Sequence, residues 1–123
     1  MADHVLVDTS VWIDHLRRRN SDLVVLLEAG QVYVHPFVIG ELACGNLAQR
    51  ATILTLLAEL PKASVLDHER VLSFLDSAKL IGQGVGWVDV SLLASAVTDR
   101  LALWTLDRRL AAAATRLGVA RRY

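Results

Sequence analysis

The sequence predicts an α/β fold, a three-layer α/β/α sandwich around a central, mostly parallel sheet of four to five strands. Short apolar runs alternate with longer helical patterns along the whole chain, which is the order that βα units produce. The apolar runs are continuous, as expected for strands that are buried on both faces of a parallel sheet. The 123 residues contain no internal repeat and no linker, so we expect residues 1–123 to form one domain.

Each expected strand except the last is followed by a helix, and several of these helices have a capping residue at their start or end. The first strand covers 5–7, and Thr9 or Ser10 can cap the next helix. A helix over 21–28 is closed by Gly30, and Pro36 opens the helix after a second strand at 32–34. The remaining expected elements are a helix over 47–60, a strand over 63–66, a helix over 68–81 capped by Asp67, a helix containing Asp89, a strand over 101–106, a helix over 108–117 and an edge strand over 119–121.

Composition limits the classes of protein that the chain can represent. Counted with glycine and without tyrosine, apolar residues make up about 58% of it, which exceeds the roughly 45–50% of average globular proteins and indicates a subunit or partner interface. Cys44 is the only cysteine, which excludes an internal disulfide and a CxxC metal site. The N-terminus has no signal pattern, and no uncharged stretch is long enough to span a bilayer, so we expect a soluble, cytoplasmic protein without membrane contact.

Charge is balanced overall but unevenly distributed. The net charge of zero argues against a protein that coats nucleic acid through bulk charge. Six of the thirteen basic residues nevertheless follow position 99, where the only acid is Asp107. Such a cluster can contact phosphates, and it can equally be a solvated helix face. The glycine-rich segment 82–86 follows a helical pattern rather than a strand, so it does not indicate a nucleotide-binding loop.

Four acidic residues stand in apolar surroundings. Asp8 and Asp107 end apolar strand-like runs, whereas Glu41 and Asp89 interrupt apolar helical stretches. A carboxylate is costly to remove from water, so each needs hydrogen bonds, a counter-charge or a metal. Ligands of open α/β sheets bind beyond the carboxyl ends of the strands, where Asp8 and Asp107 are expected. If the fold gathers all four acids, a divalent-metal site of oxygen ligands is the natural product.

Each acid also has a purely structural interpretation. Asp8 can be a turn residue, Asp107 a helix cap, and Asp89 a favourable charge at a helix N-terminus. Glu41 is harder to explain in this way, because its neighbours suggest the buried stripe of a helix. The four histidines show no metal-ligand spacing, and we interpret them as surface or loop residues: His4, His15, His35 and His68.

The segments around these acids resemble those of the PIN-domain ribonucleases, and among them the VapC toxins of bacterial toxin–antitoxin pairs. No single motif is specific, but the ordered set spans nearly the whole chain. The chain departs from the pattern at Leu110, where the family usually carries Phe, and at Leu106, where a polar residue is often found. The matching segments are VLVDTSVWI at 5–13, VIGEL at 38–42, DVSLLASA at 89–96 and LWTLDRRL at 103–110.

The resemblance implies a single PIN domain with the activity of a metal-dependent endoribonuclease, which hydrolyses RNA phosphodiester bonds to inhibit translation and growth. Mg²⁺ (or Mn²⁺) would be the cofactor, and cleavage would leave a 5′-phosphate and a 3′-hydroxyl. A homodimer and a cognate antitoxin are the implied partners. The implied site residues are the catalytic and metal-binding Asp8, Glu41, Asp89 and Asp107, the supporting hydroxyls of Thr9, Ser10 and Thr105, and the RNA-binding Arg108 and Arg109.

Three other interpretations are open to test. A receiver domain would want a second acid beside Asp8 and a lysine after the last strand, and Lys79 is the last lysine of the chain. A phosphatase of the haloacid-dehalogenase type would need an aspartate where Ser10 stands. The more serious alternative is a non-catalytic PIN-like binding module whose acids are structural.

Overall fold

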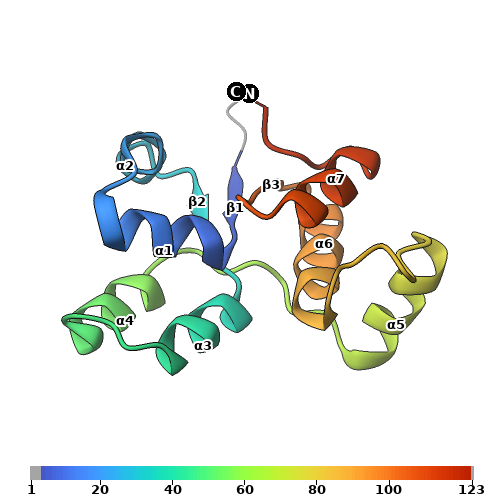
Figure 1. Cartoon of the computed structure of the whole chain (residues 1–123), viewed down its shortest axis with the longest axis horizontal. Helices are drawn as coiled ribbons and strands as arrows, with labels where there is room; N and C mark the ends of the chain where they lie inside the picture. Colours follow the sequence, from blue (N-terminus) through green and yellow to red (C-terminus); the bar gives the residue numbers. More distant parts are fainter. Residues whose placement is uncertain (1–3, 123) are drawn as a thin grey trace.

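The computed structural model describes residues 4–122. Figure 1 shows the strands between two groups of helices, α1 to α4 on the left and α5 to α7 on the right. In chain order the elements are β1 (Val5–Val7), α1 (Thr9–Arg18), α2 (Ser21–Glu28), β2 (Val32–Tyr33), α3 (Pro36–Cys44), α4 (Arg50–Ala58), α5 (His68–Ser77), α6 (Trp87–Asp99), β3 (Ala102–Trp104) and α7 (Arg108–Arg116).

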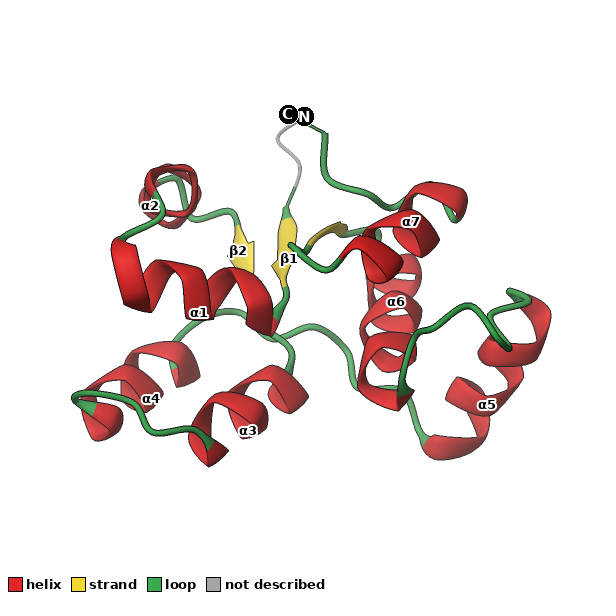
Figure 2. Cartoon of the chain, in the orientation of Figure 1, coloured by secondary structure: helices red, strands yellow, loops and turns green. Residues whose placement is uncertain are grey.

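The expected α/β class and the parallel sheet are confirmed, but the sheet is smaller than expected. Within residues 4–122 it contains three strands in the order β2-β1-β3, and both pairings are parallel. Val5 pairs with Val32 on one side and with Ala102 on the other. Figure 2 shows how short these strands are beside the helices. The prediction of four to five strands was therefore wrong.

The strand expected over 63–66 is reduced to one isolated bridge between Val34 and Lys62. Two backbone hydrogen bonds flank this bridge. The N–H of Val34 donates to the Pro61 carbonyl, and the N–H of Ala63 donates to the Val34 carbonyl. The next residue, Ser64, gives its N–H to the Asp99 carboxylate at 2.6 Å. Its carbonyl accepts from the Ser95 hydroxyl at 2.5 Å. Because side chains of α6 take both backbone groups of Ser64, the ladder cannot continue.

The edge strand expected over 119–121 is also a single bridge, between Leu103 and Ala120. The N–H of Leu103 bonds to the Val119 carbonyl, and the N–H of Arg121 bonds to the Leu103 carbonyl. Gly118, with a φ of +75°, turns the chain out of α7 immediately before this bridge. Ala120 is the residue that pairs with β3 after this turn. The next residue, Arg121, places its guanidinium 4.1 Å from the centre of the Trp104 ring.

Several helix boundaries follow the local signals in the sequence. Pro36 is the first residue of α3, and Asp67 accepts a hydrogen bond from Arg70 N–H at the start of α5. The helix expected over 47–60 starts only at Arg50, because Gln49 has a left-handed backbone with a φ of +54°. Asp8, rather than Thr9 or Ser10, is the residue that precedes α1.

The core lies around the central strand. Leu6 and Val7 of β1 are fully buried, and they pack with Leu92 and Leu93 of α6 and with Leu110 of α7. Burial on both faces explains why the strands are continuous apolar runs. Among the described residues, no helix is long and apolar enough to cross a membrane.

Candidate active site

Asp8 is a buried carboxylate at the end of the central strand. It is only 6% exposed, so its negative charge must be stabilised by the protein. Its Oδ2 accepts hydrogen bonds from Ser10 Oγ and from Thr105 Oγ1, both at 2.7 Å. Hydrogen bonds to an ionised acceptor are the strong kind, and they offset part of the cost of burial. The two hydroxyls therefore fix the position of Asp8.

The same hydroxyls connect Asp8 to the segment that carries Asp107. Ser10 Oγ accepts from the N–H of Leu106, and Thr105 Oγ1 accepts from the N–H of Asp107, both at 3.0 Å. The N–H of Asp8 itself donates to the Trp104 carbonyl at 2.9 Å. A continuous hydrogen-bond network thus joins the ends of β1 and β3. Asp8 and Asp107 are both part of this network.

Asp107 is exposed and precedes α7. Its Oδ1 accepts from the Leu110 N–H at 2.9 Å, so its predicted role as a helix cap is confirmed. The bond occupies one carboxylate oxygen of Asp107. A capping role and a ligand role are therefore chemically compatible.

Glu41 lies on α3 and is more exposed than expected. Val38 and Leu42 form the buried side of the helix, as predicted, but Glu41 itself faces outward. Its Oε1 accepts a hydrogen bond from Thr9 Oγ1 at 2.6 Å. Since Thr9 follows Asp8 directly, this bond holds Glu41 next to the start of α1.

Asp89 lies in the first turn of α6 and is partly buried. Burial raises the pKa of its carboxyl above the ordinary value, while a hydrogen bond from Gly86 N–H at 3.2 Å lowers it. The negative charges of Asp8, Asp107 and Glu41 raise the pKa of Asp89 further. Asp89 therefore lies within electrostatic range of the other three carboxylates.

The donor set suits a hard divalent cation, because carboxylate oxygens are the ligands that Mg²⁺ and Mn²⁺ prefer. Among the described residues, however, no three acidic, histidine or cysteine side chains are gathered closely enough to hold a metal. The residues therefore fit a metal by the chemistry of their oxygen atoms, although no three of them meet in one cluster among the residues described.

His35 was expected on the surface or in a loop, and it lies in the loop that precedes α3, but it is not on the surface. Its side chain is fully buried, and its Nδ1 accepts from the Phe37 N–H at 2.9 Å, which caps α3. Burial lowers the pKa of His35 to about 4, and the charge of Asp99 opposes this only in part. Its place between β2 and Pro36 was the available signal, because that is the cap position of the helix that carries Glu41.

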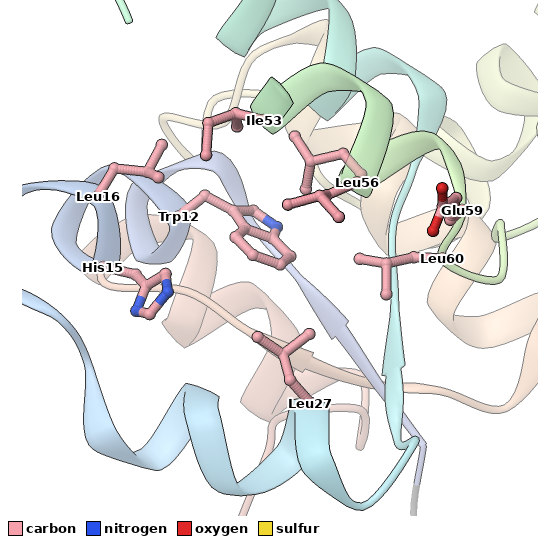
Figure 3. Close-up of a pocket in the computed structure, with 9 residues that line it drawn as sticks. Trp12, His15, Leu16, Leu27, Ile53, Leu56, Glu59 and Leu60 are labelled. Carbon is pink, nitrogen blue, oxygen red and sulfur yellow. The ribbon is translucent and has the colours of Figure 1, made fainter. Parts of the chain in front are cut away.

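A recess lies between α1, α2 and α4, and none of the four candidate acids lines it. Figure 3 shows the Trp12 indole projecting into this recess of about 420 Å³. Leu27, Ile53 and Leu56 supply much of its apolar lining, and Leu56 is 55% exposed. The indole Nε1 is buried and has no hydrogen-bond partner within the part of the chain that the structure describes. This apolar recess does not suit chemistry on a phosphodiester, but it suits the apolar side chains of another protein.

Comparisons with known proteins identify the family of the chain. The family model of the PIN domain matches residues 5–116, which include all four acids. Ribonuclease VapC32 of Mycobacterium tuberculosis (strain CDC 1551 / Oshkosh) is 47% identical over 117 residues, which cover 94% of each chain. The protein of the same name from strain ATCC 25618 / H37Rv matches to the same extent. The chain belongs to the PIN-domain family and, within it, to the VapC ribonucleases.

Proposed function

We propose that this protein is a metal-dependent endoribonuclease and the toxin of a toxin–antitoxin pair, with residues 1–123 forming one PIN domain that works in the cytoplasm. The observation that carries the proposal is the hydrogen-bond network that joins Asp8 through Thr105 to the segment of Asp107, together with the bond from Thr9, next to Asp8, to Glu41. The charges of these three acids raise the pKa of Asp89, and a bound cation would offset the repulsion among the four carboxylates.

In this proposal the four carboxylates are the groups that hold Mg²⁺ or Mn²⁺. When bound, such an ion supplies positive charge beside the scissile phosphate and lowers the pKa of a bound water. The hydroxyls of Ser10 and Thr105 keep Asp8 oriented, and the hydroxyl of Thr9 does the same for Glu41. Arg108 and Arg109 follow Asp107 directly, are exposed, and would contact the RNA backbone.

The proposed partners are a cognate antitoxin and a second copy of the chain. Both need apolar surface, and the recess beside Trp12 is the candidate contact for an apolar segment of the antitoxin. A charge in the recess, as in Leu56→Glu, should abolish co-purification of a co-expressed antitoxin. Undiminished co-purification of a folded L56E variant would refute this assignment.

The catalytic proposal is tested by incubating single-stranded RNA with the protein in EDTA, Mg²⁺ or Mn²⁺. Cleavage should require the metal, should yield 5′-phosphate and 3′-hydroxyl ends, and should be lost in Asp8→Asn. Asp76→Asn, which changes an exposed acid on α5, is the matched control and should cleave normally. Equal cleavage by folded Asp8→Asn would refute the role of Asp8.

The alternative is a non-catalytic PIN-like binding module whose acids serve the fold. The caps made by Asp107 and Asp89 are the observations that favour it. Such a module would bind RNA but would not cleave it in the presence of Mg²⁺ or Mn²⁺. Metal-dependent cleavage that Asp8→Asn abolishes excludes this alternative.

A further inference from the structure

A groove with arginine side chains lies between α7 and the glycine-rich segment 82–86. Its volume is about 270 Å³. One wall is the outer face of α7, and the other carries Gln83. The residues that line it are Gln83, Arg108, Arg109, Ala112, Ala113 and Arg116.

The positive charge of this groove is not neutralised by the protein itself. Arg108, Arg109 and Arg116 are all exposed. Within residues 4–122 the ion pairs are those of Arg18 and Arg70, so none involves the three arginines of the groove. Three adjacent cations that form no ion pair repel one another and favour an anionic ligand.

Two contacts hold these arginines in place. Arg116 Nη2 donates to the Lys79 carbonyl at 3.2 Å, which ties it to the segment before the glycines. Arg109 lies directly on Gly84, because a Cβ at Gly84 would come within 2.5 Å of Arg109 Cδ and 2.8 Å of Nη1. Gly84 also has a φ of +75°, which favours glycine. The loop therefore acts as a flat support for the Arg109 side chain.

Both walls of the groove continue into the acidic site. The loop ends at Gly86, whose N–H binds Asp89, and α7 begins immediately after Asp107. Arg109 and Arg116 are seven residues apart on one helix, which corresponds to about 10 Å along its axis. An anion that contacts both must be extended, and the two walls of the groove lead along the chain to Asp89 and Asp107.

We propose that this groove binds the phosphodiester backbone of single-stranded RNA, with Arg116 as a further phosphate contact and Gly84 as the residue that positions Arg109. The inference rests on the proposed function, which supplies the RNA, and it adds where the strand lies beyond the scissile bond. Side chains that contact phosphates contribute affinity without sequence preference, and the contribution falls as salt rises.

The test measures fluorescence anisotropy of a labelled, mixed-sequence single-stranded RNA in EDTA, over a range of salt concentrations. Arg116→Ala and Arg109→Ala should each weaken binding roughly fivefold or more and lower the slope of log Kd against log salt by about 0.7. Arg50→Ala is the control, because Arg50, on α4, is exposed and likewise donates to a backbone carbonyl, that of Ala43 on α3. Its affinity and slope should match those of the unmodified chain.

The role of Gly84 has a matched control within the same loop. Gly82 has a φ of +74°, and a Cβ added to it would have no atom within 4 Å, so Gly82→Ala carries the backbone strain without displacing Arg109. Gly84→Ala should weaken RNA binding as Arg109→Ala does, while Gly82→Ala should not, at equal melting temperatures. Equal weakening by both glycine variants would overturn the positioning role.

The outcomes separate this inference from the proposed function. Unchanged affinity and slope in Arg116→Ala and Arg109→Ala would overturn the groove, even if metal-dependent cleavage by the unmodified chain is intact. Loss of the expected cleavage, with the arginine effects present, would overturn the catalytic proposal and support the groove. No RNA binding by the unmodified chain would overturn the groove directly.

Discussion

Replacing Thr105 by valine removes one hydroxyl from the network that holds Asp8 and leaves the shape of the side chain nearly unchanged. Thr105 is buried, donates to Asp8 Oδ2 at 2.7 Å and accepts from the Asp107 N–H at 3.0 Å. A hydrogen bond to a charged acceptor contributes about 1.5–3 kcal/mol, and an N–H without its partner adds a further cost of about 1 kcal/mol or more. We therefore expect Thr105→Val to lower the free energy of unfolding by about 2–4 kcal/mol.

Urea unfolding at pH 7 in EDTA, followed by tryptophan fluorescence, measures this loss. Thr105→Ser is the rescue variant, since it keeps the hydroxyl and should lose only about 1 kcal/mol for the missing methyl group. Thr55→Val is the control, because Thr55 also uses its hydroxyl, on the Ala51 carbonyl at 2.9 Å, but on an exposed face. A Thr105→Val protein as stable as the Thr55→Val protein would refute the argument that the network stabilises Asp8.

Three further outcomes are expected. Millimolar Mn²⁺ should raise the melting temperature of the unmodified chain by linkage and not that of Asp8→Asn, and a melting curve indifferent to Mn²⁺ would contradict the metal site. The folded-state pKa of His35, about 4, lies below the ordinary value of 6.5, so its contribution to stability is full above pH 6.5 and is lost as the pH falls towards 4. Between pH 7.5 and 4.5 the free energy of unfolding should fall by about 2–3 kcal/mol in the unmodified chain but not in His35→Asn, which keeps a capping side chain. Equal pH profiles of the two proteins would show that His35 is not the cause of this fall. Asp107→Asn should keep the cap, change stability by less than about 0.5 kcal/mol and abolish RNA cleavage, and retained cleavage would show that the cap is its whole role.

The sequence predicted the parts of the fold that depend on local signals. The strands around Leu6 and Leu103 are continuous apolar runs, and the caps at Asp67 and Asp107 stand directly before their helices. The end of pairing at Ser64 could not be predicted in this way. It depends on Asp99, a residue 35 positions away, which takes the backbone N–H that a further strand residue would need.

The candidate site shows the same division between local and distant causes. The apolar run ending in Asp8 indicated a carboxylate at the rim of the sheet, and Thr105 was expected to be a supporting hydroxyl. Nothing local to Thr105, however, indicates that its acceptor is Asp8, 97 residues away. Glu41 was expected on a buried stripe because Val38 and Leu42 are apolar, and its outward direction depends on where α3 meets α1. The burial of His35 likewise depends on tertiary packing, since its sequence neighbours do not specify it.

Because β1 is the central strand, we expect the part of the site that holds Asp8 to resist local unfolding more than the part that holds Glu41. The backbone of β1 is paired on both edges, so the amide of Asp8, bonded to the Trp104 carbonyl, should exchange its hydrogen only when the whole protein unfolds. Glu41 belongs to a helix outside the sheet and is joined to Asp8's neighbour Thr9 by one exposed hydrogen bond. Opening of α3 alone would remove Glu41 and leave Asp8 and Asp107 in place. A ligand that draws the acids together would therefore slow hydrogen exchange in α3 far more than in β1.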